Sequence, residues 1–334
     1  MKRYLKTIRS DEALQRILDH VNLSGGEEYL QTYKCRGRIS SRSVYAHVSN
    51  PPFMCAAMDG YAVDFSKTIY ADLSRPLSLM ITRDAIPVNT GDPLPDGTNA
   101  VIMIEDIEDA DTSIAIRKPV YLWQNVRMIG EDIVEGDMLI PANHEITAYD
   151  IGMLISGGIT HIHVRKKPRA LIVPTGKELI DLYNVEEPVN KLGGLVDFNS
   201  YTLLNLAEET GLDCTISQIA ETKEDLYDII KNAINAYDLI FVNAGSSAGR
   251  EDYTEEVISK QGELIFHGIS MMPGKPAMFG VVDGKPVFGI PGYPVSAALI
   301  FYTFIKPLYE KMMHSPKDTK LINCKTTCKI PSRL

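Results

Sequence analysis

The chain has 334 residues, which at about 150 residues per domain predicts two domains or three small ones. Apolar residues make up 45% and charged residues 23%, a mixture typical of a globular protein, so an intrinsically disordered chain is excluded. Lys and Arg number 34 against 43 Asp and Glu, and the resulting net charge of −9 argues against a nonspecific nucleic-acid binder.

Cysteine usage and hydropathy indicate a cytoplasmic protein. The five cysteines are odd in number and mostly scattered, which argues against a disulfide framework: Cys35, Cys55, Cys214, Cys324 and Cys328. No apolar segment follows the basic N-terminus, so no signal peptide is expected. The uncharged stretch 286–305 is broken by prolines and glycines, which leaves only Val295–Ile305 as an apolar helix, too short to cross a bilayer.

The first predicted element is a helix that Ser10 can cap, with Asp11 and Glu12 favouring its positive end. Its apolar residues share one helical face: Leu14, Ile17, Leu18 and Val21. From about Val44 to Pro141, short apolar runs are broken by Pro and Gly turn signals, which predicts a β-rich segment. A helix is expected again at Thr147–Ile155.

After Pro168, short apolar strands alternate with helices. Strands are expected at Ala170–Val173, Cys214–Ile219, Leu239–Val242 and near Leu264, Phe279 and Val287, and helices at Ser200–Thr210, from Thr222 to about Ala236, from Glu251 and Asp252, and from Val295. This alternation predicts a mostly parallel sheet with helices on both faces. Ligands bind at the carboxyl ends of such strands, so the loops after Val173, Ile219, Val242 and Ile290 are the candidates for a site.

A Gly/Ser loop, Asn243–Asp252, directly follows one of the buried strands. Its backbone amides can cradle a phosphate, and a tight turn with surface serines is the alternative. The segment Gly245–Gly249 also matches the G-x-S-x-G pattern of serine hydrolases, with Asp283 and His314 following in the hydrolase order. A serine hydrolase with Ser247 as its nucleophile is therefore a distant alternative.

The turn Pro273–Pro276 presents Lys275 between prolines, which suits the binding of an oxyanion, although a solvated turn lysine is the alternative. The pairs of Gly and Asp in 56–63, 90–92 and 130–132 are typical of turns. Cys324 with Cys328, and His161 with His163, lack further ligands in suitable positions, so no metal is assigned to them.

Seven of these motifs occur in a fixed order: 57–63 (AMDGYAV), 90–97 (TGDPLPDG), 130–133 (GEDI), 174–179 (PTGKEL), the loop at Gly245, 273–276 (PGKP) and 289–297 (GIPGYPVSA). In this respect the chain strongly resembles the molybdopterin molybdenumtransferase family, the MoeA and gephyrin E-domain family. The similarity extends from the first helix to about Lys311.

The resemblance implies a multi-domain α/β fold, in which a three-layer α/β domain with a mostly parallel sheet follows a discontinuous N-terminal region. The expected division is an elongated N-terminal domain (1–45 and 140–166), an inserted β-rich domain (46–139), an α/β molybdopterin-binding domain (167–315), and the start of a C-terminal β domain (316–334). Since the family continues into a small β-rich domain, we expect the sequence to stop where that domain begins.

The resemblance further implies a magnesium-dependent, homodimeric transferase of molybdenum cofactor biosynthesis. Enzymes of the family insert molybdate into adenylated molybdopterin and release AMP, and other proteins of the pathway are expected partners. A lysine and hydroxyl donors suit the molybdate dianion, and carboxylates suit a divalent cation at the phosphate linkage. The sequence does not distinguish molybdate from tungstate.

Residue roles follow from the same resemblance. Lys275 and Ser296 would hold molybdate, Asp252 and Glu221 would position magnesium or the attacking water, and Glu178 would line the same pocket. Asp59, Thr90 and Asp132 would reach the active site across the homodimer interface. The loop residues Gly245, Ser246, Ser247 and Gly249 would offer amides or hydroxyls to phosphate.

The chain departs from the family pattern at several of these motifs. Met272 replaces the usual lysine before Pro273, Glu221 and Lys177 replace aspartates, Tyr293 replaces an asparagine, and the loop at Gly245 is one residue shorter. Met272 removes a positive charge from the expected oxyanion site. A non-catalytic pterin- or oxyanion-binding protein, or a scaffold on the same fold, is therefore the alternative hypothesis.

Overall fold

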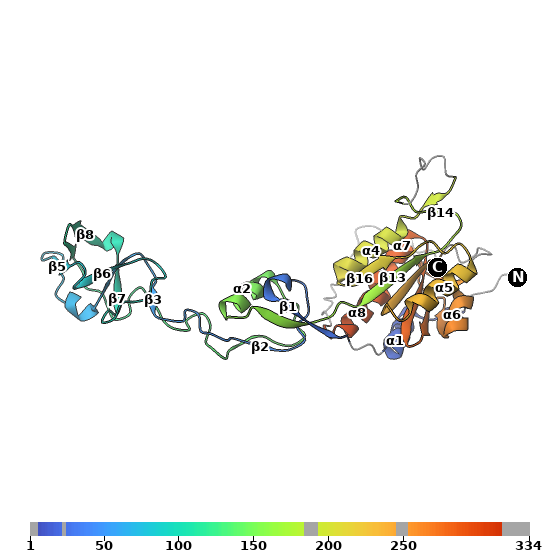
Figure 1. The fold of residues 1–334 in the computed structure, drawn as a ribbon, viewed down its shortest axis with the longest axis horizontal. Coiled ribbons are helices and arrows are strands. Elements are labelled where there is room, and N and C mark those ends of the chain that lie inside the picture. The colour runs from blue at the N-terminus through green and yellow to red at the C-terminus, as the bar shows by residue number, and fades with distance from the viewer. Residues whose placement is uncertain (1–5, 22–24, 184–192, 245–252, 316–334) are drawn as a thin grey trace, which may run out of the picture. The chain divides into compact units, whose positions relative to one another are not determined.

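The computed structural model describes residues 6–21, 25–183, 193–244 and 253–315, and its contacts divide the chain into two compact units. The α/β unit comprises Met1–Glu28, Gly37–Ser41 and Val164–Leu334, and the β-rich unit comprises Tyr29–Arg36 and Arg42–His163 (Figure 1). No helix of the described residues is long and apolar enough to cross a membrane.

A six-stranded sheet forms the centre of the α/β unit (Figure 1). Its strands, in spatial order, are β16 (Asp213–Ile216), β13 (Arg169–Pro174), β17 (Leu239–Ala244), β20 (Lys285–Pro291), β19 (Met278–Val282) and β18 (Glu263–His267). The first four are parallel to one another, and β19 is antiparallel to both of its neighbours. The prediction of a mostly parallel sheet is confirmed.

Helices cover both faces of this sheet. One face packs against α1 (Ser10–His20), α4 (Asn199–Thr210), α7 (Pro294–Ile300), the π-helical turn η4 (Phe301–Ile305) and α8 (Lys306–Met312), and the other against α5 (Lys223–Ala233) and α6 (Thr254–Gln261). The strand side chains alternate between the two cores, as a two-residue period requires. In β13, Ile172 enters the first core, whereas Leu171 and Val173 enter the second.

Helix α1 packs in the core of the α/β unit through Ala13 and Ile17, and Val21, directly after the helix, joins the same core. The sequence division placed residues 1–45 with the N-terminal domain, and the contacts instead group residues up to Glu28 with the α/β unit. The reason is hydrophobic: the apolar face of α1 is covered by α8 and η4. The predicted domain division, with boundaries at 45/46, 139/140, 166/167 and 315/316, stays a proposal.

The β-rich unit contains short antiparallel strands and the helix α2 (Ala148–Ser156). Its two three-stranded sheets have the orders β6–β4–β7 and β5–β9–β8, formed by β4 (Gly60–Val63), β5 (Leu77–Met80), β6 (Ala85–Val88), β7 (Ala100–Met103), β8 (Ile107–Ala110) and β9 (Ser113–Ile116). Two further pairs join β2 (Val44–Tyr45) to β11 (Met138–Ile140), and β3 (Cys55–Ala56) to β10 (Val126–Arg127). The β-rich texture predicted for 44–141 is confirmed.

Several predicted element boundaries need correction. Ser10 is the first residue of α1 and not its cap, because Arg9 occupies the N-cap position, where it makes no side-chain capping bond. The strand expected at Cys214–Ile219 is β16, which ends at Ile216, and the helix expected to reach Ala236 is α5, which ends at Ala233. The helix expected from Glu251 is α6, whose described part begins at Thr254.

Three of the cysteines and the pair His161 and His163 lie among the described residues. Cys35, Cys55 and Cys214 are free thiols, and burial raises the pKa of Cys214 to about 12. On β12 (His161–Arg165), the rings of His161 and His163 lie 5.3 and 4.7 Å from that of Tyr29, measured between centroids. The described residues contain no cluster of three or more His, Cys, Asp or Glu side chains that could hold a metal ion.

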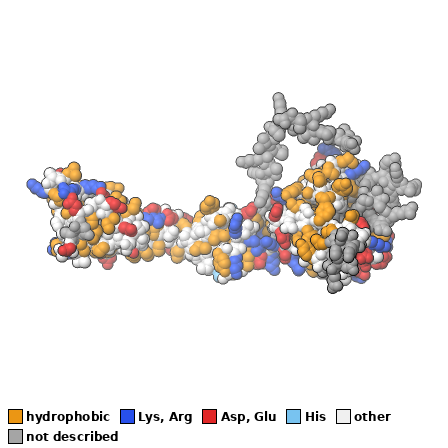
Figure 2. All heavy atoms as spheres, turned by 90° about the horizontal axis from the view of Figure 1, so that it is seen from above, with side chains coloured by type: hydrophobic (Ala, Val, Ile, Leu, Met, Phe, Trp, Pro, Cys, Tyr) orange, Lys and Arg blue, Asp and Glu red, His pale blue; other side chains and the backbone are white. Residues whose placement is uncertain are grey.

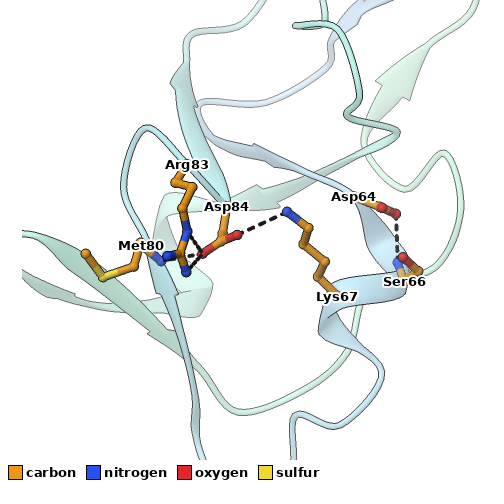
Figure 3. A network of polar contacts seen from close by, with 6 residues as sticks. All are labelled: Asp64, Ser66, Lys67, Met80, Arg83 and Asp84. Atoms are coloured by element: carbon orange, nitrogen blue, oxygen red, sulfur yellow. Dashed lines mark hydrogen bonds and ion pairs between the residues drawn. The ribbon is translucent and has the colours of Figure 1, made fainter.

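An ionic network ties the turn between β5 and β6 to the 3₁₀ helix η2 (Phe65–Thr68). Figure 3 shows the carboxylate of Asp84 between the side chains of Arg83 and Lys67. Lys67 Nζ donates to Asp84 Oδ1 at 3.0 Å, and Arg83 donates to Asp84 Oδ2 through Nη2 at 2.7 Å. Hydrogen bonds from Arg83 and Lys67 lower the pKa of Asp84 from 3.8 to about 2.

The variant Asp84→Asn is expected to unfold at a lower temperature than the wild type at pH 7. Because the folded pKa lies below the ordinary value of 3.8, the stabilisation is present above pH 3.8 and is lost as the pH falls towards 2. The difference between the two unfolding midpoints should therefore shrink over this window in thermal melts followed by circular dichroism. Asp96→Asn, at an exposed site in the same unit, is the matched control. A difference independent of pH would contradict this account.

Candidate functional site

A cavity of about 510 Å³ opens in the α/β unit at the carboxyl ends of β13, β17 and β20. This is the edge at which parallel strands present their loops to ligands, and it is where the sequence predicts a site. The lining comes from five segments of the chain: Thr175, Glu178 and Leu179; Leu195–Asn199; Asn243; Met272–Pro276; and Pro291–Tyr293 with Ser296.

Three of the predicted site residues line this cavity together: Glu178, Lys275 and Ser296. Neither the ammonium group of Lys275 nor the hydroxyl of Ser296 forms a hydrogen bond or ion pair with any other residue that the structure describes. Ser296 lies in the first turns of α7 and is 4% exposed. A free cation beside a free hydroxyl is a donor set suited to an anionic ligand.

A turn of the backbone fixes the position of Lys275 at the cavity. A turn places the Lys275 carbonyl as acceptor for the Ile269 amide at 2.9 Å, and the amide of Ala277 donates to the Gly274 carbonyl at 3.1 Å. Gly274 has a φ of +116°, and a Cβ there would lie 2.8 Å from the methyl group of Met271. The sequence therefore needs glycine at this turn, and the lysine side chain is left to project into the cavity wall.

The position of the Glu178 carboxylate depends on a second glycine, Gly176. At Gly176 the φ is +136°, and a Cβ would lie 2.6–2.8 Å from the carboxylate of Glu178. The carboxylate thus lies directly over the Gly176 backbone. The segment after it is held by the parallel pairing of β14 (Leu179–Ile180) with β15 (Leu195–Val196).

The structure adds polar residues that the sequence reasoning did not assign to a site. Asp197, Asn199, Asn243 and Thr175 all line the cavity, and the first three are at most 5% exposed. Thr175 Oγ1 donates to the Asn243 carbonyl at 3.1 Å, which ties β13 to β17 at their carboxyl ends. Asp197 and Asn199 directly precede the helix expected at Ser200–Thr210, and this Asp-x-Asn signal of a helix start could have drawn attention to them.

Exposed hydrophobic side chains accompany this polar lining. Phe198, Met272 and Tyr293 line the cavity while 57%, 69% and 76% exposed. Figure 2 shows hydrophobic side chains mixed with charged ones over the described α/β surface. Met272 and Tyr293 are two of the positions at which the chain departs from the family pattern, so both departures fall in the cavity wall.

Glu221 lies in a small hollow beside the cavity residue Thr175, with Thr222 and Thr254 among its other lining residues. Carboxylate and hydroxyl oxygens are hard donors, and Mg²⁺ is commonly held by one or two carboxylates together with substrate phosphates. The donor chemistry at Glu221 therefore fits magnesium. The second expected ligand, Asp252, lies outside the described residues, as do Gly245, Ser246, Ser247 and Gly249.

The β-rich unit brings Asp59 and Thr90 together. The Thr90 amide and hydroxyl donate to Asp59 Oδ1 at 2.6 and 2.8 Å, and these bonds hold the pKa of Asp59 below its ordinary value. Asp132 accepts from Arg127 Nη2 at 2.5 Å and, more weakly, from Asn50 at 3.4 Å. No described contact joins Asp132 to Asp59, so the prediction that the three residues act together stays a prediction.

The serine hydrolase hypothesis is not favoured. Asp283 lies in the turn before β20, at the amino end of that strand. The segment containing Ser247 lies outside the described residues, but the chain enters it from the carboxyl end of β17. Because β17 and β20 are parallel and in register over five residues, these two ends are at opposite edges of the sheet.

The α/β unit thus brings a cation, hydroxyls and carboxylates together in one cavity at the carboxyl edge of its sheet, a donor set suited to an anionic small molecule. Family models match both parts of the chain: "MoeA N-terminal region (domain I and II)" over residues 8–158 and "Probable molybdopterin binding domain" over residues 171–311. The chain belongs to the MoeA family of molybdopterin molybdenumtransferases, and this prediction is confirmed.

Individual relatives agree with this membership. A molybdopterin biosynthesis protein of Methanocaldococcus jannaschii is 36% identical over 81% of this chain and 71% of its own length. The molybdopterin molybdenumtransferase of Haemophilus influenzae is 30% identical over 90% of this chain and 77% of its own length. The crystal structure of a MoeA protein from Pyrococcus horikoshii superposes with a TM-score of 0.77 at 31% identity, covering 93% of this chain and 81% of that chain.

Family membership places the chain among the transferases of molybdenum cofactor biosynthesis, as the sequence predicted. The predicted multi-domain α/β fold class is confirmed by the same structural match.

Proposed function

We propose that this chain inserts molybdate into adenylated molybdopterin and releases AMP, with Lys275 and Ser296 holding the oxyanion. The observation that carries the proposal is the ammonium group of Lys275, which has no polar partner in the described part of the chain and lines a cavity at the carboxyl edge of the sheet. A tetrahedral dianion needs hydrogen-bond donors and positive charge, and the described wall offers both through these two side chains. Tungstate has nearly the same size and charge and should bind in the same way.

The carboxylates would act in the second part of the reaction, the cleavage of the adenylate. Glu178 would orient substrate from the loop after β13, and Glu221 with Asp252 would hold Mg²⁺ and position the attacking water at the adenylate. Magnesium, when bound, neutralises charge that develops at the phosphate linkage. Water cleaves the phosphoanhydride linkage to give AMP and the pterin phosphate, and the dithiol of the pterin forms two Mo–S bonds as one oxo ligand of molybdate leaves as water.

The proposed active form is a homodimer. On the family resemblance, Asp59, Thr90 and Asp132 of one subunit contribute to the site of the other. The pair of hydrogen bonds from Thr90 keeps the Asp59 carboxylate ionised and fixed in orientation, as a residue that must meet a ligand needs to be. A monomer in solution would contradict this part of the proposal.

The variant Asp252→Ala is expected to abolish AMP release from adenylated molybdopterin while leaving the dimer folded. The reason is the loss of one of two carboxylates at the magnesium site, for which a drop of at least about a hundredfold is reasonable. AMP is measured by chromatography, and size-exclusion chromatography tests the dimer. The control is Asp228→Ala, which removes an exposed carboxylate from α5.

Two other experimental outcomes would each contradict a different part of the proposal. Unchanged turnover by Asp252→Ala would remove Asp252 from the site. If the wild type binds molybdate and the pterin in calorimetry but releases no AMP, the non-catalytic binding or scaffold hypothesis is favoured instead.

A further inference from the structure

The cavity wall contains a buried carboxylate that has no positive partner. Asp197 is 5% exposed, and its Oδ1 accepts a hydrogen bond from the Ser200 amide at 3.1 Å. No Lys, Arg or His of the described residues forms an ion pair with it. Because a buried charge is costly without compensating hydrogen bonds, Asp197 is a strong acceptor for a ligand donor.

A second acceptor lies two residues away, on the first turn of α4. Asn199 is 4% exposed and lines the same cavity. Its Nδ2 donates to Asn243 Oδ1 at 2.9 Å, and Asn243 Nδ2 in turn donates to Ser200 Oγ at 3.2 Å. This chain of donors orients the Asn199 amide and leaves its Oδ1 buried without a hydrogen-bond partner among the residues that the structure describes.

Two acceptors are unsuited to the anionic parts of a substrate. A carboxylate repels phosphate and molybdate. These anions would instead bind to Lys275, the one cation among the described residues that line the cavity. The part of the ligand that meets Asp197 and Asn199 must therefore carry adjacent N–H donors. Phe198 lies between them in the chain and lines the cavity while 57% exposed, so its ring can stack on a flat heterocycle.

We propose that Asp197 and Asn199 recognise the pterin ring of the substrate through its adjacent ring N–H and 2-amino donors. The inference rests on the proposed function and adds to it the residues that select the heterocycle. A carboxylate accepts two parallel N–H bonds well, as it does from arginine. A lumazine, in which an oxo group replaces the 2-amino group, would present an acceptor to these acceptors and should be rejected.

The test compares the two heterocycles directly. The wild-type chain is titrated with 6-hydroxymethylpterin and with 6-hydroxymethyllumazine, and binding is followed through the fluorescence of each compound. We expect the pterin to bind at least about tenfold more tightly, equivalent to about 1.4 kcal/mol. Equal affinity for the two compounds, or no binding of either up to about 1 mM, would overturn the inference.

The variant Asp197→Asn tests whether the carboxylate of Asp197 causes the preference for pterin over lumazine. It keeps the oxygen that accepts from the Ser200 amide, so the fold is retained, and it replaces one acceptor by a donor. The preference for pterin should fall to within about twofold, whereas molybdate binding in calorimetry stays unchanged. Asp213→Asn, an exposed carboxylate of the same unit, is the control that should keep the preference. If Asp197→Asn kept the full preference for pterin over lumazine, Asp197 would not be the residue that selects the heterocycle.

AMP release by the wild type tests the proposed function separately. A chain that prefers pterin over lumazine but releases no AMP would retain this inference and lose the proposed reaction. A chain that releases AMP but binds pterin and lumazine equally well would retain the proposed reaction and lose this inference.

Discussion

Replacing Lys275 with alanine is expected to abolish measurable molybdate binding and to lower AMP release by about 10²- to 10³-fold. The lysine is the only cation lining the cavity in the described part of the chain. Its ammonium group has no hydrogen-bond or ion-pair partner in residues 6–21, 25–183, 193–244 and 253–315, so the unfolding midpoint should not change. Calorimetry with molybdate gives the affinity, and the AMP assay gives the rate.

The matched control for this variant is Lys231→Ala, which removes an exposed lysine from the last turn of α5. It changes the net charge by the same amount at a distance from the cavity, and both readouts should keep their wild-type values. If Lys275→Ala binds molybdate as the wild type does, the oxyanion site lies elsewhere.

Replacing Phe288 with alanine is expected to lower the free energy of unfolding by about 3–5 kcal/mol. Phe288 is 2% exposed and lies between Phe241 and Phe279 on the central strands, with ring centroids 6.0 and 5.0 Å away. Truncation leaves a cavity between rings that cannot close it, because β20 is fixed by pairing on both sides. No larger single effect on stability is expected from the residues discussed.

Urea unfolding followed by circular dichroism at 222 nm measures this change. The control is Tyr302→Ala, at a side chain that is 51% exposed, and its cost should stay below about 1 kcal/mol. A loss below about 1 kcal/mol for Phe288→Ala would show that this aromatic cluster does not stabilise the sheet as described.

The sequence alone predicted the α/β layers and the edge of the sheet where the cavity lies. Both follow from local signals: buried apolar strands such as Ala170–Val173 alternate with capped amphipathic helices such as the one after Thr222. Thr222 does form a capping box with Asp225. The loops after Val173 and Ile290 were candidates from the strand pattern, but Glu178, Lys275 and Ser296 were grouped into one site only through the family resemblance.

Other features depend on contacts between distant residues and leave no local pattern. Strands β14 and β15 are two residues each, and only their pairing across residues 179–196 brings Asp197 to the cavity. The amphipathic face of α1 predicted burial but could not name the α/β core as its partner. The hydrogen bond between Asn199 and Asn243 joins side chains 44 positions apart.

The most direct measurement is the anomalous X-ray signal of molybdenum in crystals of this chain soaked with molybdate. The account predicts a peak inside the cavity at the carboxyl edge of β17 and β20, within hydrogen-bonding distance of Lys275 Nζ and Ser296 Oγ, and no such peak in crystals of Lys275→Ala. A molybdenum peak only at other sites, with this cavity empty at saturating molybdate, would contradict it.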